Sequence, residues 1–71
     1  EASAAAREAA RLYRLIAGME ELYRETALLI LAEGLSHAQA GAVLACAENT
    51  VSWRMHEVKK RLKATMEKER P

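Results

Sequence analysis

Four apolar residues near the C-terminal end, Val51, Met55, Val58 and Leu62, are spaced by four, three and four positions. This spacing places them on one side of an α-helix, because a helix repeats about every 3.6 residues. A chain of 71 residues can bury only one small core. We therefore expect this side of the last helix to face the core, which leaves its opposite side open to a partner.

The composition favours helices in the rest of the chain as well. Hydrophobic residues make up 51% of the sequence and aromatic residues 4%, with three glycines and a single proline at the end. Such a sequence lacks the residues that build and separate β-strands. We predict an all-α fold, a single four-helix domain over residues 1–71 that contains a helix-turn-helix. Because the chain begins with Glu1 and not with methionine, we expect a fragment of a longer protein.

Glycines delimit the first two predicted helices. The first is expected from about Ser3 to Ala17, before Gly18, and the second from about Met19 to Glu33, before Gly34. Gly34 suits a helix C-cap, where glycine adopts the left-handed conformation at least cost. The unbroken apolar run from Ala27 to Ala32 predicts that the second helix contacts its neighbours on several sides and forms the centre of the core.

The third helix has the clearest local signal at its start. Ser36, followed three positions later by Gln39, forms a capping box in which each side chain bonds the other residue's amide. The helix should extend to about Ala45, and Gly41 should let another helix approach closely. We expect it to bury three side chains: Ala40, Val43 and Leu44.

A fourth helix is predicted from about Glu48 or Asn49, so that two helices flank a brief turn. This is the layout of a helix-turn-helix. Its first helix braces against the DNA backbone, and its second presents outward side chains to base edges in the major groove. The outward positions near the start of this second helix would be Glu48, Asn49, Ser52, Trp53 and His56.

The net charge of +1 hides an asymmetry between the two parts of the chain. Residues 1–50 carry four arginines against seven glutamates, a net charge of −3, whereas residues 51–71 carry seven lysines and arginines against three glutamates, a net charge of +4. A basic segment of this kind is either a phosphate-binding face or a solvated helix surface. The side chains available to hold a DNA backbone are Arg54, Lys59, Lys60, Arg61 and Lys63.

Other classes of function find no support in the sequence. It has no nucleophile with a base, no paired carboxylates in an apolar setting and no glycine-rich phosphate loop, so we expect neither an enzyme nor a cofactor. His37, His56 and Cys46 are too few for a zinc site, and Cys46 is expected to be a small core residue. With one cysteine and no apolar run of membrane-spanning length, we expect a cytoplasmic protein that does not enter a membrane.

Several short motifs follow one another along the chain: Arg24-Glu25, Glu33-Gly34-Leu35-Ser36, Asn49-Thr50-Val51, Arg54-Met55 and Arg61-Leu62. In this order they resemble region 4 of bacterial sigma factors, especially the extracytoplasmic-function group, with Met19-Glu20 standing where that family usually has Leu-Pro. The resemblance implies a domain that reads the −35 promoter element and contacts the flap of the RNA polymerase core. It also implies that an anti-sigma factor could control the domain.

The helix-turn-helix layout and this resemblance together give a predicted DNA-binding set. It comprises Glu48, Asn49, Thr50, Ser52, Trp53, Arg54, His56, Glu57, Lys59 and Lys60. The family often has basic residues at the positions of Ser52 and Glu57, and a serine where Trp53 stands. A carboxylate at Glu57 would weaken phosphate binding, although it could accept a hydrogen bond from a cytosine amino group.

Two alternatives remain at this point. The output domain of LuxR-type response regulators has a similar Ala-Glu-Gly-Leu-Ser turn and Thr-Val motif, and Trp53 suits it, but Arg54 stands where that family commonly has histidine. A sigma-like module could instead bind an anti-sigma factor, or form a weak homodimer, without touching DNA. Trp53 would then be an exposed aromatic at a DNA or partner face, or a half-buried residue at the edge of the core.

Overall fold

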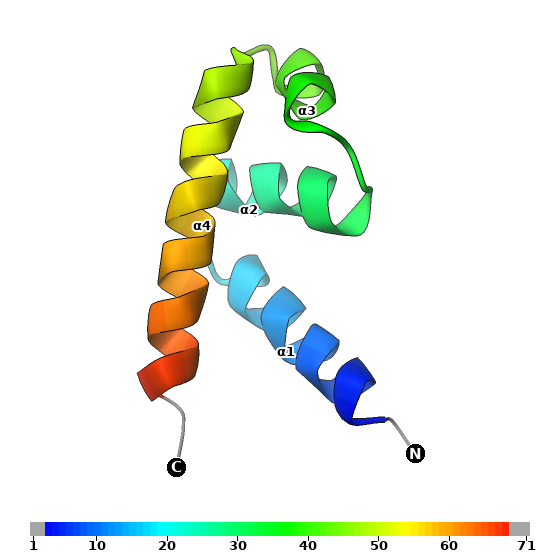
Figure 1. Cartoon of the computed structure of the whole chain (residues 1–71), viewed down its shortest axis with the longest axis vertical. Helices are drawn as coiled ribbons and strands as arrows, with labels where there is room; N and C mark the ends of the chain where they lie inside the picture. The colour runs from blue at the N-terminus through cyan, green and yellow to red at the C-terminus, as the bar shows by residue number, and fades with distance from the viewer. Residues whose placement is uncertain (1–2, 69–71) are drawn as a thin grey trace.

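The computed structural model describes residues 3–68, and within this range the chain is helical without strands (Figure 1). The elements are α1 (Ala4–Ala17), α2 (Glu21–Ala27), the π-helix η1 (Leu28–Ala32), α3 (His37–Leu44) and α4 (Glu48–Lys68). Because η1 continues α2 directly, there are four helical segments, which confirms the predicted all-α fold with a helix-turn-helix. Three charges counted above, Glu1, Glu69 and Arg70, lie outside the described residues. No helix in the described range is both long and apolar enough to span a membrane.

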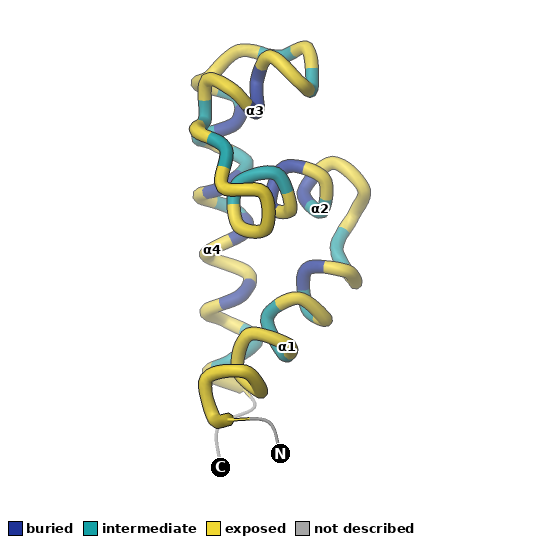
Figure 2. The backbone as a smooth tube through the Cα atoms, turned by 90° about the vertical axis from the view of Figure 1, so that its right-hand side faces the viewer, coloured by how far each residue is buried: buried dark blue, intermediate teal, exposed yellow. Residues whose placement is uncertain are grey.

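The last helix, α4, organises the fold. Its 21 residues extend about 31 Å at about 1.5 Å per residue, most of the molecule's 39 Å length. Val51, Met55 and Val58 are at most 1% exposed, and Leu62 is 9% exposed, which confirms that this side of the helix faces the core. The start of α4 packs against α3, its middle is crossed by α2, and α1 packs against its second half (Figures 1 and 2).

The first helix is capped and anchored as its sequence requires. The Ser3 hydroxyl accepts a hydrogen bond from the Ala6 amide at 3.1 Å, which satisfies one of the free amides at the helix start. Ile16 is fully buried near the other end, with Leu12 and Leu15 packed against the same core. The helix ends at Ala17, as predicted.

The second helix differs from the prediction in its start and in its burial. It begins at Glu21 instead of Met19. Its buried residues are Tyr23, Thr26 and Ala27, all on α2, whereas no residue of η1 is buried. Leu28 and Leu31 are 37% and 45% exposed. The second helix contacts α1, α3 and α4, so the predicted contact on several sides is confirmed. The prediction that it forms the centre of the core is wrong, because its apolar run is not buried beyond Ala27.

The π-helix widens the last turn before the loop. The Glu33 amide donates to the Leu28 carbonyl five residues earlier, at 3.1 Å, where an α-helix would bond four residues back. The Leu35 amide then donates to the Leu29 carbonyl at 3.0 Å and closes the helix end. Gly34 lies between them with φ of 71°, the left-handed conformation that the sequence predicted for it.

The start of α3 is the capping box that the sequence predicted. The Gln39 amide donates to the Ser36 hydroxyl at 3.1 Å, and the Ser36 amide donates to the Gln39 side chain at 2.8 Å. Ala40 is buried as expected, and Leu44 is half-buried. The predicted burial of Val43 is wrong, since its side chain is 62% exposed. The buried residues of α3 are Ala40 and Gly41, whereas Val43 borders a groove with residues of α2 and η1.

The turn between α3 and α4 depends on a close backbone contact. A Cβ atom at Gly41 would lie 2.7 Å from the Cys46 carbonyl oxygen, so glycine is required by the turn itself and not, as predicted, by another helix. The Cys46 amide donates to the Gly41 carbonyl at 2.9 Å and holds this approach in place. Ala45 makes the reversal with φ of 56° and ψ of 44°, a left-handed conformation that the sequence did not predict.

Candidate nucleic-acid interface

The exposed residues of α4 separate into distinct sides once its core-facing side is fixed. His56 and Lys63 each lie three and four positions from Lys59 and Lys60, so the four side chains form one contiguous group on the helix surface. All four are exposed. We call these four residues the basic strip. It contains three of the predicted DNA-binding residues and adds Lys63.

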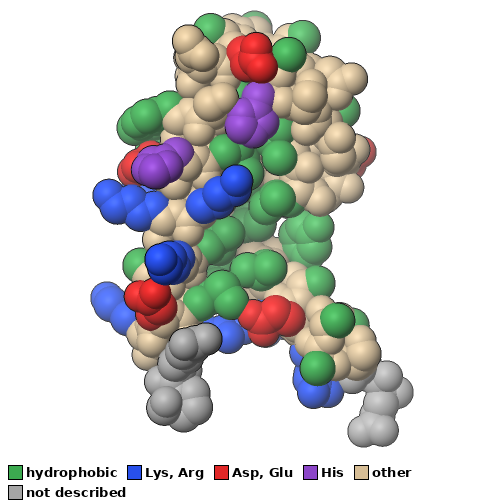
Figure 3. Space-filling model, in the orientation of Figure 1, with side chains coloured by type: hydrophobic (Ala, Val, Ile, Leu, Met, Phe, Trp, Pro, Cys, Tyr) green, Lys and Arg blue, Asp and Glu red, His purple; other side chains and the backbone are tan. Residues whose placement is uncertain are grey.

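Ser52 and His37 join α3 to α4 at the end of the basic strip. The Nδ1 atom of His37 lies 2.8 Å from the Ser52 hydroxyl oxygen, and both residues are half-buried. Ser52 precedes His56 by four positions and so continues the same side of α4. The histidines lie on one face of the molecule together with lysine and arginine side chains (Figure 3). The sequence did not predict this contact, because nothing in the local pattern around His37 indicates a partner on the next helix.

Trp53 lies beside the basic strip, three positions before His56, and it contacts an aromatic residue of α2. Its ring centroid is 6.3 Å from that of Tyr23, at an interplanar angle of 41°, and its side chain remains 55% exposed. The Arg61 guanidinium stacks over the same Tyr23 ring, 4.3 Å from the centroid. Trp53 therefore both packs at the edge of the core and presents a large exposed face. Arg61 supports the fold through this contact, in addition to its charge.

Arg54 turns away from the basic strip, whereas Glu57 lies between the strip and Arg61. Arg54 precedes Arg61 by seven positions, and Glu57 precedes Arg61 by four positions and Lys60 by three. Arg54 is half-buried, and its Nη1 atom donates to the Cys46 sulfur at 3.7 Å. Glu57 is also half-buried. The acidic side chain that was expected to oppose phosphate binding thus adjoins Lys60 at the edge of the strip.

The remaining predicted residues surround the start of α4. Glu48 and Asn49 are exposed in its first turn, and Thr50 is half-buried. The structure therefore brings together the beginning of α4, Ser52 and the basic strip as one surface. Of the predicted set of ten, Arg54 lies away from that surface, and Trp53 and Glu57 lie at its edge. Cys46 is half-buried and packs against the core, as expected.

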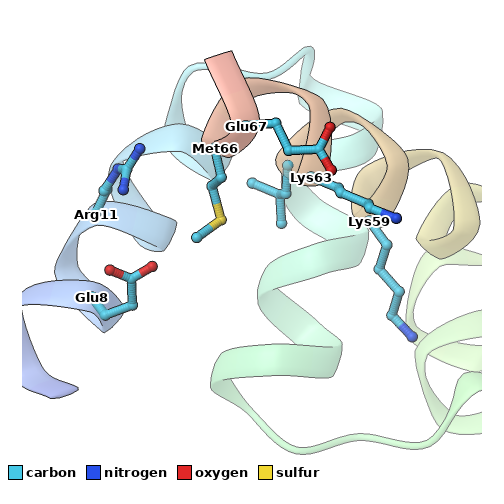
Figure 4. A pocket seen from close by; sticks show the side chains of 7 residues that line it. Glu8, Arg11, Lys59, Lys63, Met66 and Glu67 are labelled. Carbon is cyan, nitrogen blue, oxygen red and sulfur yellow. The ribbon is translucent and has the colours of Figure 1, made fainter. Parts of the chain in front are cut away.

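A groove separates α1 from the second half of α4, and Lys59 and Lys63 of the basic strip border it (Figure 4). It has a volume of about 630 Å³. Leu62 and Met66 supply its apolar surface, and the Met66 side chain extends into the space between the helices (Figure 4). The charged residues at its rim are Glu8, Arg11, Lys59, Lys63 and Glu67. Residues 3–68 contain no group of three or more histidine, cysteine, aspartate or glutamate side chains placed to hold a metal ion.

Comparison with protein families identifies one matching family model. Its description is sigma-70, region 4, and it matches residues 9–62, well over half of the chain. The matched range includes most of α1, all of α2, η1 and α3, and the part of α4 up to the last buried residue of its core-facing side. It favours the sigma-factor interpretation of the sequence motifs over the LuxR-type alternative. Comparisons with curated proteins and with solved structures give no match.

Proposed function

The chain belongs to the sigma-70 region 4 family, a promoter-binding domain of sigma factors, and from this premise we propose that it binds the −35 promoter element. The start of α4 enters the major groove, and the basic strip contacts the phosphate backbone beside it. The observation that carries this proposal is the arrangement of His56, Lys59, Lys60 and Lys63 on one exposed side of α4.

The charge distribution around the strip supports this orientation. Lysine side chains lower the free energy of DNA binding by displacing counterions from phosphates, and they do so most effectively when grouped on one surface. Glu57 adjoins Lys60 at the edge of the strip and offsets part of this positive charge. The His37–Ser52 contact at 2.8 Å holds α3 against the start of α4, so both helices can approach the same groove together.

Base reading in this orientation falls to the exposed first turn of α4. Asn49 can form a bidentate hydrogen bond with adenine, and Glu48 can accept from the amino group of cytosine. Trp53 and Arg54, which we expected in the DNA-binding set, have contacts with Tyr23 and Cys46 instead. We propose that these two residues support the helix and do not read bases.

The test is a salt titration of binding to a labelled pool of bacterial promoter fragments. We expect the double variant K59Q/K63Q to bind more weakly and to lower the slope of log affinity against log salt by about 2, since each phosphate contact contributes about 0.9. The matched control R61Q/K68Q removes the same charge from the other side of α4 and should change the slope much less. Equal effects of the two variants, or no affinity even at low salt, would refute the proposal.

Ser52→Arg sharpens this test because it adds charge at the end of the strip. The side chain is half-buried, but arginine is long enough to reach outward past His37. We expect tighter DNA binding by roughly threefold to tenfold, from one added phosphate contact. Unchanged affinity in the same titration would remove this side of α4 from the interface.

RNA polymerase is the second partner that membership of the family implies. We propose that its flap binds the groove between α1 and α4, where Leu62 and Met66 offer an apolar surface with charges of both signs around it (Figure 4). We also assign the chain to the extracytoplasmic-function group, on its Arg24-Glu25 and Glu33-Gly34-Leu35-Ser36 motifs. A Met66→Glu variant that still pulls down polymerase core as well as the unchanged chain would exclude this groove.

A further inference from the structure

A second groove lies between η1 and α3, which we call the η1–α3 groove. It has a volume of about 370 Å³. Its lining residues are Glu25, Leu28, Leu29, Glu33, Val43 and Leu44. Four of the six are aliphatic and the other two are acidic, and no lysine or arginine takes part. This composition differs from that of the basic strip and of the groove beside α1.

The aliphatic side chains of the η1–α3 groove are unusually exposed for a domain of this size. Val43 is 62% exposed and Leu28 is 37% exposed, and they lie in one surface with half-buried Leu29 and Leu44. Single exposed apolar residues are ordinary, whereas a contiguous set marks a binding surface. The groove is also bordered by the π-helix, and π-helical turns occur frequently at functional sites.

The electrostatics of this groove exclude the nucleic acid proposed for α4. Glu25 and Glu33 are both exposed at its edge, and their charges would repel phosphates. The groove uses the C-terminal end of α3, through Val43 and Leu44, whereas the basic side of the molecule uses its first residue, His37. The two surfaces could therefore be occupied at the same time.

We propose that the η1–α3 groove binds an amphipathic helix of a partner protein whose apolar side is flanked by lysine or arginine. Two helices with an apolar channel between them accept a third helix through side chains three and four positions apart. Glu25 and Glu33 are eight residues apart, about two turns of the helix that carries them. A partner helix lying along the groove pairs with both when its cations are seven positions apart, with leucines between them.

The probe for this proposal is a labelled synthetic helical peptide with lysines at positions i and i+7 and leucines at i+3 and i+4. A second peptide carries glutamates in place of the lysines. Binding of each to the whole chain is followed by fluorescence anisotropy. We expect the lysine peptide to bind at least about tenfold more tightly than the glutamate peptide, because two charge pairs change sign. Equal affinity of the two peptides would overturn the proposal.

Charge reversal in the groove should reverse the preference. In E25K/E33K we expect the glutamate peptide to bind more tightly than the lysine peptide, with promoter binding retained. The matched control E20K/E21K makes the same change of net charge at the exposed start of α2, outside the groove, and should leave the preference for the lysine peptide unchanged. A similar loss of lysine-peptide binding in both variants would show attraction to net charge alone and would overturn the proposal.

Two further measurements on the unchanged chain do not depend on how the variants fold. Amide chemical shifts should move at Leu28, Leu29, Val43 and Leu44 when the lysine peptide is added, and shifts confined to α4 would contradict the proposed site. Sedimentation of the chain alone should show a monomer. A dimer that protects Val43 would instead assign the groove to a second copy of the chain and overturn the proposal for a partner protein.

Discussion

The junction between α3 and α4 and the helix formed by α2 and η1 are both rich in small and aliphatic residues, yet they are held in different ways. The junction is fixed by directed local contacts: a capping box at Ser36, a close backbone approach at Gly41 and a left-handed residue at Ala45. The α2–η1 helix contacts α1, α3 and α4 but leaves Leu28 and Leu31 exposed. The first region positions side chains accurately, and the second keeps apolar surface available.

This difference shows how a small domain divides its limited core. The buried apolar side chains of α4 face one core, and α3 reaches this core through the small side chain of Ala40. Little apolar surface then remains to cover η1. In a region fixed by backbone geometry, adding a single atom should lower the free energy of unfolding. In an exposed apolar region, even a polar replacement should change it little.

The largest effect should come from Gly41→Ala in the junction. The added Cβ would lie 2.7 Å from the Cys46 carbonyl oxygen. Because this oxygen is a backbone atom, it cannot move away by a side-chain rotation. We expect the free energy of unfolding to fall by about 2 kcal/mol, as in other overpacked sites. Urea denaturation measures this change. An unchanged midpoint would mean that the turn can accommodate the added atom. The junction would then not be fixed by this backbone contact, and it would not differ from the α2–η1 helix in this respect.

A smaller effect of opposite sign is expected from Ala45→Gly. The residue has φ of 56° and ψ of 44°, where a Cβ atom costs about 1–2 kcal/mol and glycine is relaxed. Glycine also raises the entropy of the unfolded chain, which offsets part of this gain. The net increase in the free energy of unfolding should be about 0.5–1 kcal/mol. The matched control Ala42→Gly, at an exposed position inside α3, should lose about 0.5–1 kcal/mol. Destabilisation by both variants would contradict the left-handed turn.

The smallest effect is expected in the α2–η1 helix, from Leu31→Gln. The side chain is 45% exposed, so a polar replacement removes little buried apolar area. We expect a change in unfolding free energy of less than about 0.5 kcal/mol. The same replacement at Leu62, which is 9% exposed on α4, should cost at least about 2 kcal/mol and serves as the comparison. Equal losses at the two leucines would show that η1 is part of the core.

The junction also shows what the sequence can predict. Three features were predictable because each depends on a few residues close together in the sequence. They are the capping box at Ser36 and Gln39, the left-handed Gly34 and the core-facing side of α4. These local patterns, with the order of motifs along the chain, were enough for the fold and for its family.

The parts that were not predictable depend on contacts between distant residues. The apolar run Ala27–Ala32 suggested burial, but burial depends on how many neighbours a chain of this length can supply. The His37–Ser52 contact and the Arg61–Tyr23 stacking join residues on separate helices, so no local sequence pattern predicts them. Ala45 adopts a conformation usually left to glycine, because the turn closes around Gly41 and forces it.

A titration of the whole chain with a promoter duplex, followed by amide chemical shifts, tests most directly which surface meets DNA. We expect the shifts to change at His37, Ser52, His56 and Lys59, and to stay constant at Leu28 and Val43. Changes centred on the η1–α3 groove, with the basic strip unaffected, would contradict the assignment of α4 as the DNA-binding helix.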